Sequence, residues 1–381
     1  MVLLAAAAGI AVANVYYVQP LLQLIADDFH APARTVGLVS VMMQAGYALG
    51  IVAFVPLGDI LQPRKLLVAM FAAVAVMLAA AAAAPTIALL AAATLAIGLC
   101  TTCAQVLMPF AADFATPAQR GRVIGMMQTG LIIGTLFARA AGGVVGAHSG
   151  WRAVFWGAAG LCAASAAALA RVLPLRPPRA HMRYADLLGS IFALVVRYPA
   201  LRASMALGVL AFATFAGLWT VMAFHMHELG YGSDVVGYLG VLGIGSAFAA
   251  GRFGVLADRR GTLFTGTVAW AILLAAFATL LIAGWTLWGV VAACAAFPLG
   301  LSLNQISNQT RIFSLDDAAR SRINTAYMFT NFAGGALGAL GATLAWQHGG
   351  WNAAATFHLA LVAAMAPVLV WYRRLDGLRR S

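Results

Sequence analysis

Charged side chains are scarce in this sequence. Of its 381 residues, 9% are Asp, Glu, Lys or Arg, and 63% are hydrophobic. Soluble domains carry about 25% charged and about 45–50% apolar residues. A soluble chain could not bury this much apolar surface, so the composition indicates a protein that lies in a lipid bilayer. There each helix needs about 20 mostly apolar residues to span the membrane.

Other scarcities exclude other classes of protein. The four cysteines all lie in apolar runs, and the C-x-x-C pair Cys100 and Cys103 has no second ligand pair, so we expect small buried residues rather than a metal or redox site. The pattern G-x-x-x-x-G-K-[ST] does not occur, which excludes a P-loop ATPase. We predict no cofactor, no metal and no enzymatic activity, because no nucleophile and base converge within the apolar runs.

Twelve apolar runs divide the chain. Because a lone strand in lipid would leave its backbone groups unpaired, each run is expected to be a helix. The sequence therefore predicts an all-α integral membrane protein of twelve transmembrane helices in two pseudo-symmetric six-helix bundles. The runs cover about 2–26, 34–58, 65–84, 86–111, 121–147, 151–173, 201–228, 233–257, 262–284, 286–313, 321–346 and 350–372.

A repeat supports the two bundles. Arg120-Gly121-Arg122 opens a glycine-studded apolar run that closes at His148-Ser149-Gly150-Trp151, and Arg320-Ser321-Arg322 opens a run that closes at His348-Gly349-Gly350-Trp351. Six identities recur at a constant offset of 200, with Gly134 and Gly334 among them. A fixed offset of half a chain indicates two copies of one structural unit.

The basic residues predict the orientation. Twenty of the 23 Lys and Arg residues lie on one side of the predicted helices, and cytoplasmic loops collect such residues, so both termini are expected in the cytoplasm. The same placement argues against a nucleic-acid partner despite the net charge of +12. A Pro- and Arg-rich linker is expected over 174–200, resting on anionic lipid headgroups, between bundles over 1–173 and 201–381. Ala11-Val12-Ala13 resembles a cleavage site, but the run before it has no basic start, so we expect a retained span.

The loops that follow two of the predicted helices carry a motif. Gly254 to Gly261 reads G-V-L-A-D-R-R-G, and the first half keeps Leu57, Asp59 and Arg64 of the same pattern. The motif resembles the G-x-L-x-D-R-x-G-R loop of the major facilitator superfamily. An acid at a helix end beside a basic turn can pair with a neighbouring helix terminus. The expected cytoplasmic gate comprises Asp59, Arg64, Asp113, Arg122, Asp258 and Arg259.

Within that family the chain is similar to the bacterial drug- and sugar-efflux permeases. The stretch from Asn14 to Leu22, N-V-Y-Y-V-Q-P-L-L, resembles the opening helix of the arabinose-efflux branch. Gly130 to Gly134 resembles the start of the antiporter pattern G-x-x-x-G-P-x-x-G-G, although Thr135 replaces its proline. The resemblance implies a monomer in the bacterial inner membrane that exports a small molecule by alternating access. Protons are expected to drive this export. A proton-coupled importer of the same fold is the alternative.

Arg139 is the one arginine that lies near the midplane of a predicted span. An arginine near the bilayer centre costs about 2.5–3.5 kcal/mol on insertion scales, so it should face the bundle interior and have a role. It could hold an anionic group of a substrate, serve proton coupling, or extend outward to an acid. The proton-coupling candidates are Arg139, Asp27, His225 and Glu228.

Polar and aromatic side chains also gather near the expected midplane, drawn from both halves. Each alone is more typical of packing between helices, but their common depth indicates a central cavity. The candidates for substrate binding are Asn14, Tyr17, Gln44, Tyr47, Gln128, Arg139, Phe215, Trp219, Asn304, Asn308, Tyr327 and Asn331.

Overall fold

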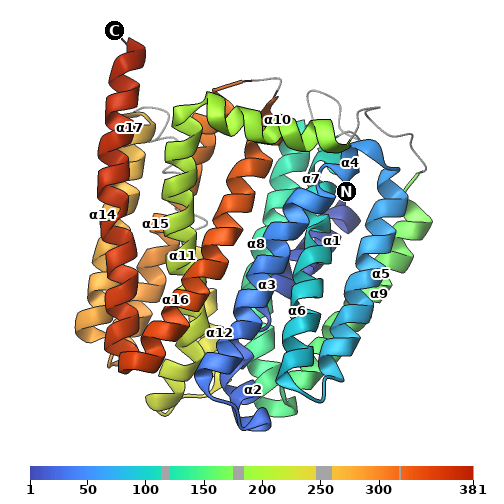
Figure 1. Cartoon of the computed structure of the whole chain (residues 1–381). Coiled ribbons are helices and arrows are strands. Elements are labelled where there is room, and N and C mark those ends of the chain that lie inside the picture. The colour runs from blue at the N-terminus through green and yellow to red at the C-terminus, as the bar shows by residue number, and fades with distance from the viewer. Residues whose placement is uncertain (113–119, 175–183, 246–259, 317–318, 381) are drawn as a thin grey trace. The chain divides into compact units, whose positions relative to one another are not determined.

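The protein was analysed as a computed structural model that describes residues 1–112, 120–174, 184–245, 260–316 and 319–380. The described residues form helices and turns, with no β-strand among them. They divide into two compact units: unit 1 comprises Met1–Leu188 with Gly232–Tyr238, and unit 2 comprises Gly189–Tyr231 with Leu239–Ser381. Figure 1 shows the elements of both.

Unit 1 is built on two close helix pairs, α1 with α8 and α3 with α6, and α5 packs against α9. Its first transmembrane segment is divided into α1, η1 and α2. The helices are α1 (Val2–Tyr16), η1 (Gln19–Leu21), α2 (Leu22–Phe29), α3 (Ala33–Phe54), α4 (Leu57–Ile60), α5 (Pro63–Ala82), α6 (Ile87–Thr101), α7 (Cys103–Ala112), α8 (Arg120–Ser149) and α9 (Trp151–Val172).

Unit 2 is organised around α11, which packs along α16, while α14 packs along α15. Two helices, α10 (Tyr184–Arg197) and α12 (Ser233–Val241), carry residues of both units. The others are α11 (Pro199–Glu228), α14 (Thr262–Ala283), α15 (Leu287–Phe313), α16 (Arg320–Ala363) and α17 (Met365–Arg380).

Ten helices among the described residues are long and apolar enough to cross a membrane. The last covers Arg320–Leu375, 56 residues, and non-helical backbone at Gly349 and Gly350 interrupts it. Most of the predicted span 233–257 lies outside the described residues, so the count of twelve stays a prediction. The all-helical, multi-span architecture is confirmed.

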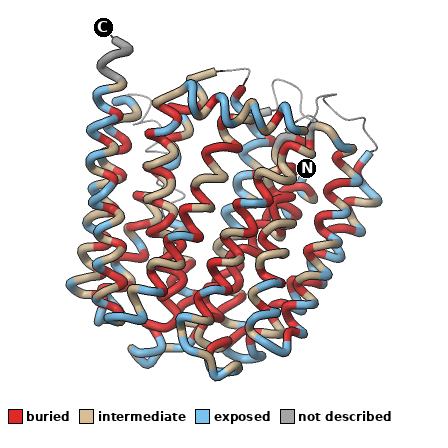
Figure 2. Tube along the Cα trace, viewed as in Figure 1, coloured by how far each residue is buried: buried red, intermediate tan, exposed pale blue. Residues whose placement is uncertain are grey.

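Burial separates inner helices from outer ones. Each of these helices has a most apolar stretch, and the buried share of that stretch can be compared. It is 78% in the segment containing α1 and in α11, but 33% in α14. In Figure 2, α5 alternates buried and exposed residues along its length, whereas α1 is buried almost throughout. The outer faces are apolar as well, as expected of helices that meet lipid.

The repeated sequence folds in the same way in each unit. His148 and His348 each place Nδ1 on the carbonyl four residues earlier, at 2.9 and 2.7 Å. Gly150 and Gly350 follow with φ of +79° and +57°, values that glycine adopts without strain. The tryptophan after each glycine is buried. The repeat therefore predicted a shared helix–turn–helix corner.

Glycines allow the central helices to approach closely. A Cβ built on Gly134 of α8 would overlap the backbone of Gly9 on α1, and one on Gly338 of α16 would overlap the backbone of Ala213 on α11. Small residues at such positions let helix backbones approach in membranes. The G-x-x-x-G spacing thus marks a packing seam in each unit.

One helix was not predicted. The segment expected to be a polar linker over 174–200 contains α10, a helix of 14 residues. Asp186 lies in its first turn and Arg197 in its last, both favourable for the helix dipole. Pro199 then begins α11.

Candidate functional site

The first transmembrane segment, Val2–Phe29, changes from an α-helix to a 3-10 turn at Gln19 and Pro20, and we call this irregular place the break. Helix α1 ends at Tyr16, and a 3-10 turn from Gln19 to Leu21 leads into α2. Proline has no backbone N–H, so one hydrogen bond of the helical ladder is missing at Pro20. Gln19 is fully buried at this break. Transporters commonly form their binding sites where transmembrane helices are discontinuous.

Arg139 of α8 lies against this break. It is 3% exposed, and its Nε donates a hydrogen bond of 3.0 Å to Oε1 of Gln19. Its guanidinium carbon lies 4.5 Å from the centre of the Tyr16 ring. Gly142, less than one turn further on, would bring a Cβ within 3.4 Å of the Tyr17 carbonyl, so the two chains are close here. We name Arg139, Gln19 and Tyr16 the arginine site.

The guanidinium is therefore held by a neutral amide and a ring face. An arginine stays protonated in proteins, so it keeps its positive charge and cannot carry a proton itself. What the arginine site can do is attract an anionic group or repel a cation, according to the state of neighbouring groups.

Other candidates of unit 1 lie on helices that pack against α1 or each other. Nδ2 of Asn14 donates to Sγ of Cys162 at 3.3 Å, and Nε2 of Gln105 donates to the Tyr47 hydroxyl at 3.2 Å. Gln44 is 1% exposed, and its Oε1 has no hydrogen-bond partner among the described residues. The contacts of Asn14 and Tyr47 therefore join neighbouring helices, which is the packing role that the sequence indicates for each of these residues taken alone.

Tyr17 and Gln128 differ in their surroundings. Tyr17 is buried at the break in the first segment, whereas Gln128 is exposed on α8, about three turns before Arg139. Helix α8 thus changes from exposed to buried along the face that carries these two polar residues.

Unit 2 brings three predicted residues together with Ser204 and an arginine. Nη1 of Arg311 donates to Ser204 Oγ and to Asn308 Oδ1, both at 3.4 Å. The side-chain amides of Asn308 and Asn331 lie near the Tyr327 hydroxyl. All five side chains are buried. Helices α11, α15 and α16 each contribute to this cluster.

The remaining candidates of unit 2 lie on α11 and α15. Asn304 donates through Nδ2 to the carbonyl of Leu207 at 3.4 Å. The rings of Phe215 and Trp219 lie 6.4 and 6.3 Å from the ring of Phe297. The predicted aromatic wall of α11 is thus part of a larger aromatic cluster.

The proton-coupling candidates other than Arg139 have contrasting environments. His225 is fully buried, its ring stacked at 3.6 Å and 8° on Trp351, with Nε2 at 2.8 Å from the carbonyl of Gly284. Glu228, three positions later, is exposed, as is Asp27 on α2. His225 is therefore buried within unit 2, although it lies in the last turn of α11.

A sequence profile of the Major Facilitator Superfamily matches residues 4–339. The chain belongs to this superfamily. Two relatives from Escherichia coli O157:H7 and K12, named as uncharacterized transporters YgaY, are 36% identical to it, covering 98% of this chain and 95% of theirs. A probable transporter of Streptomyces coelicolor, SCO4007, is 34% identical, covering 92% of this chain and 82% of its own. The chain is a multi-pass membrane transporter and not an enzyme.

Solved structures agree on the fold. A crystal structure of the nucleoside transporter NupG matches with a TM-score of 0.77 at 14% identity, covering 97% of this chain and 99% of NupG. A bacterial homologue of the human lysosomal transporter Spinster, inward-facing and occupied, matches with a TM-score of 0.74 at 12% identity, covering 98% and 96%. At these identities the likeness establishes the major facilitator fold alone.

The expected superfamily gate is described only in part. Arg64 donates to the carbonyl of Ala170 near the end of α9, and Arg122 is exposed. Asp113, Asp258, Arg259 and the side chain of Asp59 lie outside the described residues.

Sequence reasoning missed three residues of these clusters. Gln19 stands out in the sequence only as part of a family motif. Arg311 resembles a loop cation, but Asn304, Asn308 and Arg311 recur at the spacing of one helix face, which is the signal that could have identified it. His358 was overlooked inside an apolar run. It is 1% exposed, with Nδ1 at 2.6 Å from the Ala354 carbonyl. A lone ionisable residue within a transmembrane run is itself a signal.

Proposed function

We propose that this transporter exports small organic compounds, uncharged or cationic, in exchange for protons. The observation that carries this function is Arg139, a permanent cation held at the break of the first transmembrane segment by Gln19. A buried charge at such a place is costly and therefore typical of a substrate or ion pathway.

Alternating access is the mechanism that we propose. The glycine seams at Gly134 and Gly338 are supporting evidence, because smooth backbone-to-backbone contacts suit helices that slide or rock. In this scheme two six-helix bundles, 1–173 and 201–381, alternate about a central site in a monomer. Both termini lie in the cytoplasm and the loop acids Asp59 and Asp258 close the cytoplasmic side.

The proposed substrate class follows from the candidate side chains. Amides such as Asn14, Gln44 and Asn304 and aromatic rings such as Phe215 and Trp219 bind hydroxyl, amide and ring groups better than carboxylates. The fixed cation at Arg139 disfavours a second positive charge close by, so in this proposal a cationic substrate binds at the amide and aromatic side chains and away from Arg139. We assign Arg139 to coupling: it holds back a protonated state until an outer carboxylate is occupied.

Inverted membrane vesicles from cells that produce the transporter test this function. After respiration acidifies their lumen, addition of a nucleoside, a monosaccharide or a lipophilic cationic dye should release protons, reported by recovery of acridine fluorescence. We expect at least one of these probes to do so, and Arg139→Gln to abolish the response while substrate counterflow persists. The alternative, a proton-coupled importer, would instead give proton movement in the same direction as the solute.

Arg152→Gln is the matched control, because Arg152 is a partly exposed arginine ion-paired with Asp28. It should retain proton release close to the unmodified protein. Equal loss in both variants would show that the assay reports total charge or expression rather than the arginine site.

A further inference from the structure

Unit 2 contains a cavity that none of the candidates predicted from the sequence lines, and Arg311 is the one member of the buried unit 2 cluster that reaches it. It has a volume of about 1090 Å³ and lies between α14, the end of α15 and α17. Among its fifteen described lining residues, three are arginines and none is acidic. The cavity is therefore strongly cationic and lies on helices at one side of the unit.

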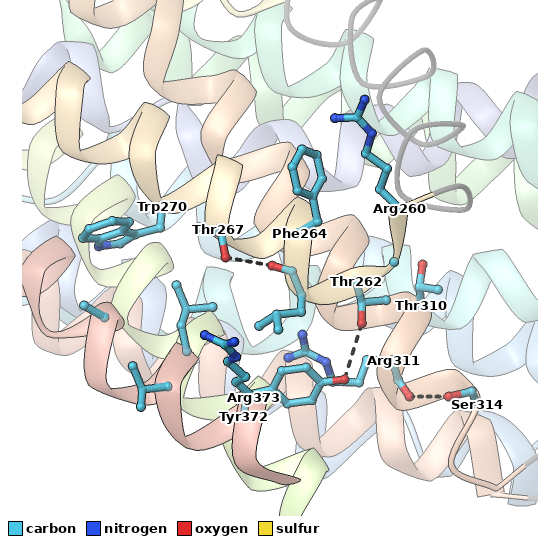
Figure 3. Close-up of a pocket in the computed structure, with 15 residues that line it drawn as sticks. Arg260, Thr262, Phe264, Thr267, Trp270, Thr310, Arg311, Ser314, Tyr372 and Arg373 are labelled. Atoms are coloured by element: carbon cyan, nitrogen blue, oxygen red, sulfur yellow. Dashed lines mark hydrogen bonds between the residues drawn. The ribbon is translucent and has the colours of Figure 1, made fainter. Parts of the chain in front are cut away.

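Two of the arginines are arranged around one tyrosine. The guanidinium carbon of Arg311 lies 3.0 Å from the centre of the Tyr372 ring, and Figure 3 shows Arg373 on the same side of the cavity. Arg260 lies at another edge, 5.1 Å from the ring of Phe264. Buried packing fixes Arg311, while the exposed Arg373 is able to close over a ligand. Arginine N–H groups bind phosphate oxygens in pairs.

Part of the lining is apolar. Trp270 of α14 is held by a hydrogen bond of 2.9 Å from Nε1 to the carbonyl of Val362. Leu369 and the exposed Val370 of α17 line the cavity as well. A ligand that fills this space would have an anionic end at the arginines and a hydrocarbon end along Trp270.

We infer that this cavity binds an anionic phospholipid. The phosphodiester lies between Arg311 and Arg373, and an acyl chain follows Trp270. Basic pockets between transmembrane helices on the cytoplasmic side take such headgroups, and the distribution of basic residues predicts that this end is cytoplasmic. A zwitterionic lipid would bring an ammonium group to three arginines, and a soluble phosphate would leave the apolar part of the lining unused.

The test uses the purified full chain in a neutral detergent. Its melting temperature and its lipid adducts in native mass spectrometry are measured with phosphatidylglycerol, cardiolipin, phosphatidylcholine and inorganic phosphate. We expect the two anionic lipids alone to bind and raise the melting temperature. Each arginine near an anionic lipid contributes enough that its loss lowers affinity about fivefold. Arg373→Gln should show this loss without unfolding, because Arg373 is exposed.

Arg374→Gln is the matched control, because Arg374 is the exposed neighbour that does not line the cavity. It should bind both anionic lipids as the unmodified chain does. Equal weakening in Arg373→Gln and Arg374→Gln would reduce the effect to general surface charge. Equal stabilisation by inorganic phosphate would identify a soluble phosphate site. Either result would overturn the lipid assignment.

Discussion

The sharpest prediction concerns the arginine site, because its energetics can be worked from its contacts. Placing Arg139 near the bilayer centre costs about 2.5–3.5 kcal/mol. The Nε of Arg139 donates a hydrogen bond of 3.0 Å to Gln19. A hydrogen bond that involves a charged group stabilises by about 1.5–3 kcal/mol. The ring of Tyr16, 4.5 Å from the guanidinium carbon, adds about 0.5–2 kcal/mol. The free-energy cost of burying the charge and the stabilisation from these two contacts are similar, so the site contributes little net stability.

Two variants should therefore behave unequally. Arg139→Met removes both the cost and the stabilisation, and leaves Gln19 Oε1 without its donor, so we expect a destabilisation of about 1–2 kcal/mol. Gln19→Leu keeps the buried charge but removes its acceptor, so we expect about 2–3 kcal/mol. The double variant should be more stable than Gln19→Leu alone by about 1–2 kcal/mol, so the effects of the two single changes should fail to add by a coupling of about 3 kcal/mol. Melting temperatures in detergent measure all four corners of the cycle.

Transport separates the role of Arg139 from its stability. The double variant should fold well and still fail to concentrate solute against a pH gradient, because the charge is absent. Arg139→Lys keeps a charge but not the planar fork, so partial coupling is expected. Normal transport in Arg139→Gln and Arg139→Lys would remove the arginine from the site. Additive effects in the Gln19 cycle would refute the energetic reasoning.

Two further predictions concern the fold. Gly134→Ala should destabilise the protein by about 1–3 kcal/mol because its Cβ would overlap the backbone of Gly9, whereas Gly125→Ala on the same helix should stabilise it by about 0.5–1 kcal/mol because no atom lies within 4 Å; thermal melting compares them, and equal shifts would contradict the seam. Cysteines at Gln62 and Thr262, introduced singly, should react with a membrane-impermeant thiol reagent only from the cytoplasmic side, and labelling of either from outside would contradict the predicted orientation.

Much of the fold could be predicted because its signals are local. Apolar runs end where proline, glycine or arginine begins, so the expected helix over 65–84 is observed as Pro63–Ala82 and that over 151–173 as Trp151–Val172. Helix α10 was missed because the arginines and prolines that flank it resemble a linker. Its leucines at positions 187, 188 and 194 follow a helical spacing that composition alone conceals.

The candidate site was less predictable because it depends on helix rotation. The depth of Arg139 follows from counting along α8, but its partner Gln19 is 120 positions away on another helix. Periodicity gives the face of a helix and not the neighbour that the face meets. The same limit applies to Arg311, whose burial between Ser204 and Tyr372 depends on three helices.

The two units share a framework and differ in chemistry. Gly134 and Gly334, at the repeat offset of 200, both mark close backbone contacts. Arg139, by contrast, is matched by the buried Ala339, and Arg311 is matched by an alanine in the first half. In the proposed alternating access, a shared framework lets the two bundles move in similar ways. In the same proposal, coupling is a task of Arg139 in one half alone, so the repeat does not require a matching cation at Ala339 in the other half.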